Sequence, residues 1–334
     1  MIMRSQLLVR LASLVALLAL SAASPVLAQQ PAAAAPDSDT AVWITLGTGG
    51  GPILRVRRAG PANALVLGGE VILFDAGEGV IQGLARAGLR LDQVSTVVIS
   101  HLHPDHIAGL SALIALRWHV SATSPLVIAG PPGTSELVDG IIASLKPVEA
   151  TKSPDEKPSP STANWVAARV IACDGTSQMI GRVQIKAVRN SHYSLRDGTD
   201  SKTATSCSFR IEAGERSIVY TGDTGPSPAV TALARHAELL VSEVMDLDAA
   251  LANVDRQSAY LTAEQREGVN WHLKAHHLTA EQVGVLAQEA EVGQVVLTHL
   301  VPGDDGETTT AGYTAGIANT YRGKVIVAED GDRF

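Results

Sequence analysis

The segment "VSTVVISHLHPDHIAG" (residues 94–109) joins an apolar, β-branched run to a cluster of three histidines and one aspartate. The apolar run is typical of a buried strand, and Pro104 is typical of the first position of a helix. Side chains alternate along an extended chain, so the histidines before the proline point to one side. The helix start turns the polar residues after it back toward them. The segment therefore predicts a strand, a metal-binding loop and a helix, with candidate ligands His101, His103, Asp105 and His106.

Four more polar residues stand where an apolar run ends. Asp75 ends "VILFD", His192 ends "VQIKAVRNSH", Asp223 ends "SIVYTGD" and His299 ends "QVVLTH". Ligands of sheet proteins bind in the crevice beyond the strand ends, so these side chains converge if their strands share one edge. Neutral imidazoles and carboxylates suit Zn²⁺, and a catalytic zinc site keeps one position open for water. The pattern therefore predicts a catalytic metal site.

Short apolar strands alternate with amphipathic helices along the rest of the chain. Three strands joined by glycine turns are expected to form an antiparallel run at 41–49, 62–69 and 70–77. Further strands are expected at 94–100, 125–130, 166–173, 183–192, 206–214, 216–223, 238–244, 294–300 and 324–331, and helices at 80–89, 106–119, 135–146, 227–237 and 279–290. Mixed strands and helices in two successive halves predict an α/β fold with layers of helix, sheet, sheet and helix.

The first 28 residues have the pattern of a secretory signal peptide. Arg4 and Arg10 precede the apolar run "LASLVALLAL", which is followed by the small residues of "SAASPVLA". The run is shorter than the roughly 20 residues of a membrane span, so no stable membrane anchor is expected. Residues 29–40 are predicted to be a disordered tether, and 41–334 a single hydrolase domain in the periplasm or outside the cell.

The charge and the cysteines restrict the partners and the compartment. A formal net charge of −8 is a poor match for a polyanion, so we expect a small-molecule ester as substrate and no nucleic acid. The oligomeric state is left open. Cys173 and Cys207 are the two cysteines. They are expected to form one disulfide in an oxidising compartment or to remain two buried thiols, and the sequence does not decide between these.

The motifs "FDAGEG", "SHLHPDHIAG", "NSH", "YTGDTGP" and "LTHL" occur in an order that resembles the metallo-β-lactamase superfamily of hydrolases. The resemblance implies an αββα sandwich with a two-zinc site at one edge of the sheets. It also implies that Asp75 orients the metal loop from outside the ligand set. It assigns His101, His103 and His192 to the first metal, Asp105, His106 and His299 to the second, and Asp223 to a bridge between them.

Two features resemble one branch of this superfamily, that of tRNase Z and its arylsulfatase-like relatives. Asp223 stands where β-lactamases usually carry a cysteine or a further histidine. "HLT" at 277–279 resembles an element in which a histidine acts near the leaving group. His277 is therefore the candidate proton donor, and His276 is its rival. Thr279 and Gln282 have the spacing of a capping box for the helix that follows.

These observations predict an exported hydrolase with two zinc ions that acts on a phosphodiester or aryl sulfate, with Asp105, Asp223 and His277 as catalytic residues. The loop at 146–162 balances its lysines with acids, unlike a basic arm for tRNA, and is interpreted as a rim or lid. The alternatives are a lactone, carboxylic ester or β-lactam hydrolase of the same fold, or an oxidoreductase with one iron ion.

Overall fold

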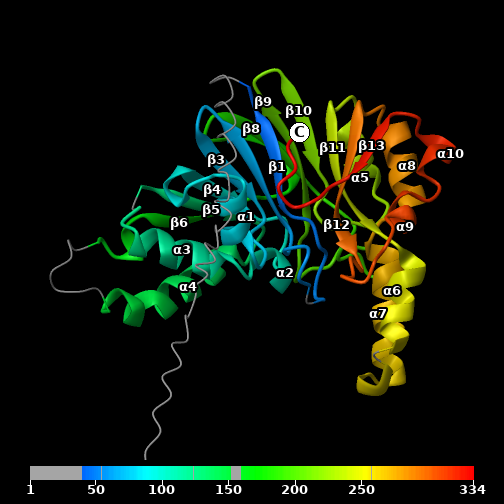
Figure 1. Cartoon of the computed structure of the whole chain (residues 1–334), viewed down its shortest axis with the longest axis horizontal. Coiled ribbons are helices and arrows are strands. Elements are labelled where there is room, and N and C mark those ends of the chain that lie inside the picture. The colour runs from blue at the N-terminus through cyan, green and yellow to red at the C-terminus, as the bar shows by residue number, and fades with distance from the viewer. Residues whose placement is uncertain (1–39, 54, 123, 152–158, 257) are drawn as a thin grey trace, which may run out of the picture. The chain divides into compact units, whose positions relative to one another are not determined.

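A computed structural model describes residues 40–53, 55–122, 124–151, 159–256 and 258–334. The predicted signal peptide and nearly all of the predicted tether lie outside these residues. The described chain forms two sheets that pack face to face, with helices on their outer faces (Figure 1).

The first sheet has six strands in the order β1-β2-β3-β4-β5-β6. The first three pair antiparallel, as predicted, and the later ones pair parallel. Gly68 and Gly69 join β2 to β3 with positive φ angles of 59° and 82°, which a two-residue hairpin turn requires. The bounds are β1 Val42–Gly47, β2 Ala62–Leu67, β3 Glu70–Phe74, β4 Val94–Val98, β5 Leu126–Gly130 and β6 Val166–Val170.

The second sheet has seven strands in the order β13-β12-β11-β10-β9-β8-β7. Strands β7 to β10 pair antiparallel and β10 to β13 pair parallel, so each sheet has an antiparallel and a parallel part. The bounds are β7 Asp174–Ile180, β8 Val183–Arg189, β9 Cys207–Ala213, β10 Arg216–Tyr220, β11 Leu239–Met245, β12 Gln294–Val301 and β13 Lys324–Val327.

Three large apolar clusters separate the layers. One lies between the sheets and includes Trp43 and Phe74 from the first and Phe209 and Tyr220 from the second. A second cluster joins the first sheet to α1, α3 and α4, and a third joins the second sheet to α5, α8, α9 and α10. The αββα prediction is therefore confirmed. These helices are α1 Val80–Arg86, α3 Leu110–His119, α4 Thr134–Glu149, α5 Pro228–Ala234, α8 Ala280–Glu289, α9 Ala311–Thr314 and α10 Ile317–Thr320.

Two predicted helices have other bounds. The helix expected at 106–119 is two, α2 (Pro104–Ile107) and α3. They separate where the Gly109 N–H donates to the Ala76 carbonyl at 2.8 Å, an approach that leaves no room for a Cβ atom. Helix α4 continues past residue 146 through Pro147, and the Glu149 carboxylate accepts hydrogen bonds from the Thr162 amide and hydroxyl. The centre of the predicted lid, 152–158, lies outside the described residues.

The helical hairpin of α6 (Leu247–Arg256) and α7 (Ala263–His276) was not predicted. It leaves the second sheet after β11 and extends away from it (Figure 1). Helix α7 buries only His276, so it lacks the apolar stripe by which a sequence reveals a helix. Its N-terminal signal is present, since Thr262 and Gln265 form a capping box. They lie within "LTAEQ", and the same five-residue sequence spans the start of α8 at 278–282.

Cys173 and Cys207 form a disulfide whose Cα atoms lie 5.8 Å apart. The sequence had left two buried thiols as the alternative. The bond joins the segment before β7 to the start of β9, and the Cys207 amide donates to the carbonyl of Ser100, directly before His101. In the part of the chain that the structure describes, no helix is long and apolar enough to cross a membrane.

Candidate metal centre

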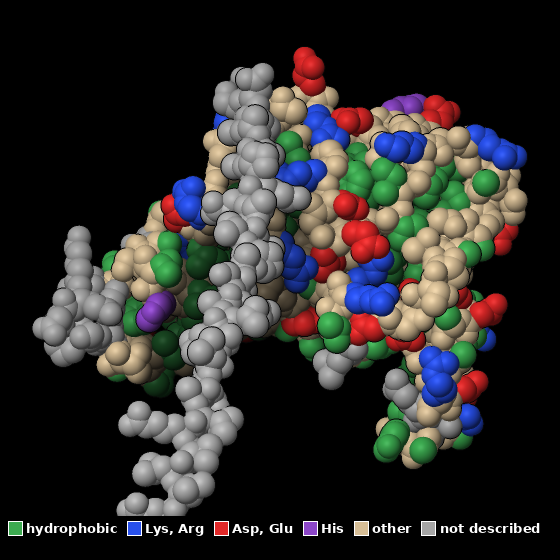
Figure 2. Space-filling view, viewed as in Figure 1, with side chains coloured by type: hydrophobic (Ala, Val, Ile, Leu, Met, Phe, Trp, Pro, Cys, Tyr) green, Lys and Arg blue, Asp and Glu red, His purple; other side chains and the backbone are tan. Residues whose placement is uncertain are grey.

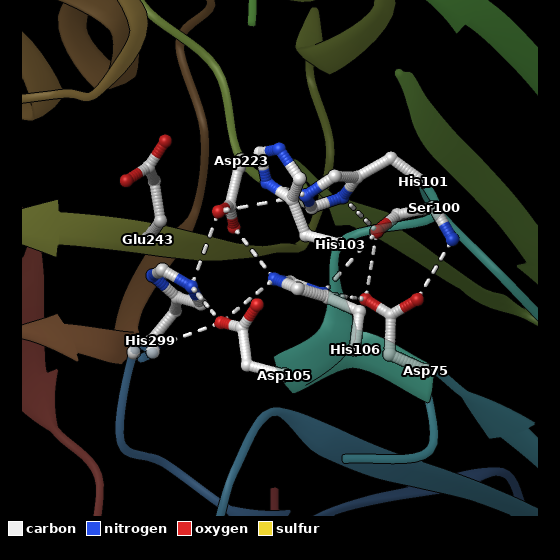
Figure 3. Close-up of polar contacts among 12 residues, drawn as sticks. Asp75, Ser100, His101, His103, Asp105, His106, Asp223, Glu243 and His299 are labelled. Carbon is white, nitrogen blue, oxygen red and sulfur yellow. Dashed lines mark hydrogen bonds and ion pairs between the residues drawn. The ribbon is translucent and has the colours of Figure 1, made fainter. Parts of the chain in front are cut away.

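Four side chains from three places in the chain form the first ligand group. His101 and His103 follow β4, His192 follows β8 and Asp223 follows β10, and one potential ligand atom of each lies within 4.8 Å of the others. His101 Nε2 and His103 Nδ1 are 2.9 Å apart, and His192 Nε2 is 3.2 Å from the same His103 nitrogen. Figure 3 shows three members of this group, His101, His103 and Asp223, turned toward one another. The space between the ligand side chains is called the cavity below.

Asp105, His106 and His299 form the second group, again within 4.8 Å. Asp223 lies between the two groups. Its Oδ1 is 3.3 Å from His106 Nε2, and its Oδ2 is 3.2 Å from His299 Nε2 and 3.9 Å from His101 Nε2. The seven residues predicted as metal ligands thus converge in the two sets that the family resemblance implied, with Asp223 facing both.

Several polar atoms in this cavity are buried without a hydrogen-bond partner. They are His106 Nε2, Asp223 Oδ1, and both ring nitrogens of His299. Buried polar atoms are rarely left unpaired because desolvating them is costly. Cations bound between the two groups would satisfy them, and nitrogen and carboxylate oxygen form a donor set that suits zinc. The residues therefore fit a metal centre.

The Asp75 carboxylate holds the metal loop from behind. It accepts hydrogen bonds from the Ser100 amide at 2.7 Å, the Ser100 hydroxyl at 2.8 Å, the Tyr220 hydroxyl at 2.7 Å and His106 Nδ1 at 2.8 Å. The bond to His106 fixes the ring so that Nε2 faces the cavity, as supporting groups do in metal sites. Asp75 thus lies where the family resemblance placed it, outside the ligand set.

The glycine-rich loop after β1 closes one side of the cavity. The Gly51 N–H donates to Asp105 Oδ2 at 2.8 Å. A Cβ atom on Gly51 would lie 2.4 Å from the Asp105 side chain, and one on Gly50 would lie 2.6 Å from the His299 ring. Since real Cβ atoms do not approach so closely, these glycines let the backbone touch both side chains.

His277 and Glu243 form a buried pair beside the ligand groups. His277 Nδ1 lies 2.7 Å from Glu243 Oε2, and the other carboxylate oxygen accepts from the Thr224 amide. Because a carboxylate accepts, Nδ1 carries the proton, and Nε2 is the nitrogen left for Asp223 and His299, with which His277 forms a group within 4.8 Å. Burial alone would lower the pKa of His277, but Glu243 and then Asp223 raise it above its usual value.

His276 has a different role from His277, because it positions neighbouring side chains. Its backbone carbonyl accepts from His192 Nδ1 at 3.0 Å, which directs His192 Nε2 toward the first group. Its own ring bonds to the Ser194 carbonyl and to His272 of α7. The structure therefore places His277, and not His276, against the cavity. Glu243 and His272 lie next to the predicted proton donor, and the sequence did not reveal either of them.

The electrostatics differ between the two groups. Burial lowers the pKa of His101 and His192, which keeps these rings neutral and ready to bind a cation. Burial would also lower the pKa of His299, but the negative charge of Asp223 and the nearby carboxylates of Asp105 and Asp223, 3.6 and 3.2 Å from Nε2, raise it to about 10. Without metal, the second group therefore holds a proton that a cation must displace.

Comparison with known proteins agrees with this geometry. Residues 70–300 match the family model described as "Beta-lactamase superfamily domain". The chain belongs to the metallo-β-lactamase superfamily. As a member of this superfamily with clustered histidines and aspartates, it is a metal-dependent hydrolase.

Relatives in the superfamily carry the name ribonuclease Z. One from Mycobacterium sp. (strain KMS) is 31% identical over 266 residues, 78% of this chain and 85% of that protein. Another from Mycolicibacterium gilvum (strain PYR-GCK) is 32% identical over 270 residues, with the same coverage of both chains. Among solved structures, human tRNase Z, short form, is similar with a TM-score of 0.59 and 22% identity over 88% of this chain and 98% of that one.

The prediction that nucleic acid is not a partner is wrong, because these relatives are named as ribonucleases. It rested on a net charge of −8, which sums the whole chain and does not describe the field at one site. Figure 2 shows basic side chains interspersed among acidic ones over the face in view, so the total says little about any single surface.

Proposed function

We propose that this protein is an exported phosphodiesterase with two zinc ions. The observation that carries the proposal is the buried Glu243–His277 pair, whose His277 lies in one 4.8 Å group with Asp223 and His299. A proton donor beside the ligand groups serves a substrate whose leaving oxygen needs a proton, as an alkoxide does.

Each residue has a part in the proposed reaction. Bound zinc ions would supply positive charge for the substrate oxygens and a water of lowered pKa. Asp223, which faces both ligand groups, orients that water through a carboxylate oxygen, and Asp105 holds the opposite side of the cavity. His277 donates a proton from Nε2 to the leaving oxygen as the phosphorus–oxygen bond breaks. Glu243 keeps the ring in position and stabilises its positive charge.

The comparisons support a phosphodiester over the other esters considered. The curated relatives are named ribonuclease Z, and RNA is therefore among the substrates that we propose to test. A diphosphatase of known structure has a similar fold, with a TM-score of 0.57 and 14% identity. Since a likeness at that identity concerns the fold alone, the choice of phosphorus rests on the relatives and on the proton donor.

Export is proposed on two independent features. The N-terminal segment has the composition of a signal peptide, and Cys173 and Cys207 form a disulfide, which persists mainly in oxidising compartments. N-terminal sequencing of the protein recovered from its native cells should give a start at or near Gln29. A chain that retains Met1 in the cytoplasmic fraction would contradict export, and the proposed reaction would be unaffected by that result.

The chemistry is tested by metal analysis together with a substrate panel. Protein purified without added metal should hold two zinc ions per chain and should hydrolyse bis(p-nitrophenyl) phosphate faster than an aryl sulfate, a lactone or a β-lactam. His103→Ala should reduce both zinc content and rate, while Lys274→Ala, on the exposed side of α7, should change neither. A single iron ion would support the oxidoreductase alternative, and a preference for another ester would refute the phosphodiesterase.

A further inference from the structure

His272 lies beside the proposed reaction centre but belongs to neither ligand group. It projects from α7, and one of its ring nitrogens forms a group within 4.8 Å with nitrogens of His192 and His277. Its ring centroid is 5.3 Å from that of His277 and 6.2 Å from that of His103. The α6–α7 hairpin thus brings one extra imidazole to the side of His277 that faces the first ligand group.

Hydrogen bonds fix which nitrogen of His272 is free. The Ser194 carbonyl can only accept, so His276 Nε2, at 2.9 Å, carries a proton and donates it. A neutral imidazole has one N–H, which leaves His276 Nδ1 as an acceptor. His272 Nδ1 lies 2.8 Å from that atom and must donate to it. His272 Nε2 therefore has no proton and offers a lone pair.

A metal ion is a poor match for this lone pair. Of the two other members of the group, His192 has its Nδ1 bonded to the His276 carbonyl and its Nε2 directed at the first ligand group. His277 has its Nδ1 bonded to Glu243. Neither ring is free to share a further cation with His272 without leaving the site already described. A hydrogen-bond donor of the substrate is the partner that remains.

We propose that His272 Nε2 accepts a hydrogen bond from a substrate hydroxyl on the carbon next to the one that bears the leaving oxygen. This inference rests on the proposed function, because it takes His277 as the donor to the leaving oxygen. Neighbouring oxygens of a 1,2-diol can reach two imidazoles whose ring centroids are 5.3 Å apart. His272 is then a specificity-determining residue that favours phosphodiesters of ribose or glycerol over deoxy analogues.

The reaction that would reveal this preference is the hydrolysis of uridylyl-(3′,5′)-uridine. Water adds its oxygen to phosphorus, the bond between phosphorus and the 3′ oxygen breaks, and the 3′ oxygen receives a proton. The products are uridine and uridine 5′-phosphate. The matched substrate lacks only the 2′-hydroxyl of the first nucleoside. A second pair, glycerophosphocholine and its analogue without the central hydroxyl, tests whether glycerol provides the same group.

The experiment measures kcat/KM on both pairs for the zinc-loaded full chain and three variants. The unsubstituted protein should prefer the hydroxylated member of at least one pair by about tenfold, the effect of one hydrogen bond. His272→Phe should reduce that ratio to about one by slowing only the hydroxylated substrate. His272→Gln, which retains an acceptor, should restore part of the ratio. Lys274→Ala, on the same helix, should leave the ratio unchanged.

Bis(p-nitrophenyl) phosphate, which has no hydroxyl, separates the possible failures. All variants should hydrolyse it at the rate of the unsubstituted protein and should hold the same amount of zinc. If the unsubstituted protein hydrolyses this substrate but does not prefer the hydroxylated member of either pair, the role of His272 is overturned and the proposed function is not. A His272→Phe protein that loses zinc would also overturn it, in favour of a metal ligand. No hydrolysis of any phosphodiester by the unsubstituted protein would refute the proposed function as well.

Discussion

Replacing Glu243 by glutamine should separate the proton donor from the metal centre. Glu243 is buried, with one oxygen on the Thr224 amide and the other 2.7 Å from His277 Nδ1. A glutamine keeps the shape and can still accept from Thr224, but it presents an N–H₂ group to His277. At neutral pH, His277 Nδ1 must then become an acceptor, and the ring becomes neutral with its single proton on Nε2.

The size of the effect follows from the pKa of His277. Glu243 is the largest influence that raises this pKa against burial, and an adjacent opposite charge is typically worth about one to three pKa units. A general acid acts below its pKa, so the rate should fall as pH rises through it, and in Glu243→Gln that fall should occur about one to three units lower. At neutral pH the loss should be about 10²-fold, within the usual range of about 10²–10⁴ for general acid catalysis.

The assay compares two leaving groups at full zinc occupancy. An alkyl phosphodiester, whose alkoxide needs the proton, should show the whole loss, and a p-nitrophenyl ester, which leaves nearly unaided, should be slowed much less. His277→Ala should match Glu243→Gln, and the double variant should be no slower, because residues that act as one unit are not additive. Equal losses on both leaving groups, or an unshifted pH profile, would refute this assignment.

Three other substitutions or treatments have definite expected outcomes. Asp223→Ala should lower both zinc content and turnover on every substrate, because its carboxylate faces both ligand groups; normal zinc in the variant would contradict this. Asp75→Ala should lower the free energy of unfolding by about 3–5 kcal/mol in urea titrations with chelator present, since several buried donors lose their acceptor; Asp75→Asn should cost less. Zinc binding to the metal-free protein at pH 7 should release a proton from the second group, where the pKa of His299 is about 10, as measured by calorimetry in buffers of different ionisation enthalpy. Affinity there should weaken as pH falls, and a buffer-independent heat would contradict the assignment.

The sequence was sufficient to locate the ligands because each stands at or soon after the end of an apolar run, although His299 lies inside β12 in the structure; the family resemblance then divided them into two groups. The residue types and strand ends are local signals, and the fold brings those ends to one edge of the sheets. Asp75, His192 and His299 were predicted in this way from runs of a few residues. The convergence itself required that these strands share one edge, which the runs do not show and which the family resemblance implied.

Glu243 and His272 could not be predicted because their roles depend on distant contacts. Glu243 lies inside the buried strand β11, at a shift in its pairing with β12. In the sequence it is one residue of an ordinary strand, and its role is visible only when the fold places His277 against it. His272 and His276 have helical spacing, but helix α7 is polar over most of its surface, so its pattern did not identify it. The net charge led to the wrong expectation about nucleic acid for a related reason, because a total charge does not say where on the surface the charges lie.

The α6–α7 hairpin is closed at its base. The Met245 amide at the end of β11 donates to the Leu278 carbonyl at 2.8 Å, and Met245 pairs with Thr279 in an isolated bridge. Everything between these residues leaves the second sheet and returns to the same point. Evolution or a protein engineer could therefore exchange the outer part of this excursion for one of another length while Glu243 and His277 keep their positions. Only a hairpin cut back almost to its base would keep the proton donor and lose the acceptor at position 272, because His272 lies one turn from the end of α7.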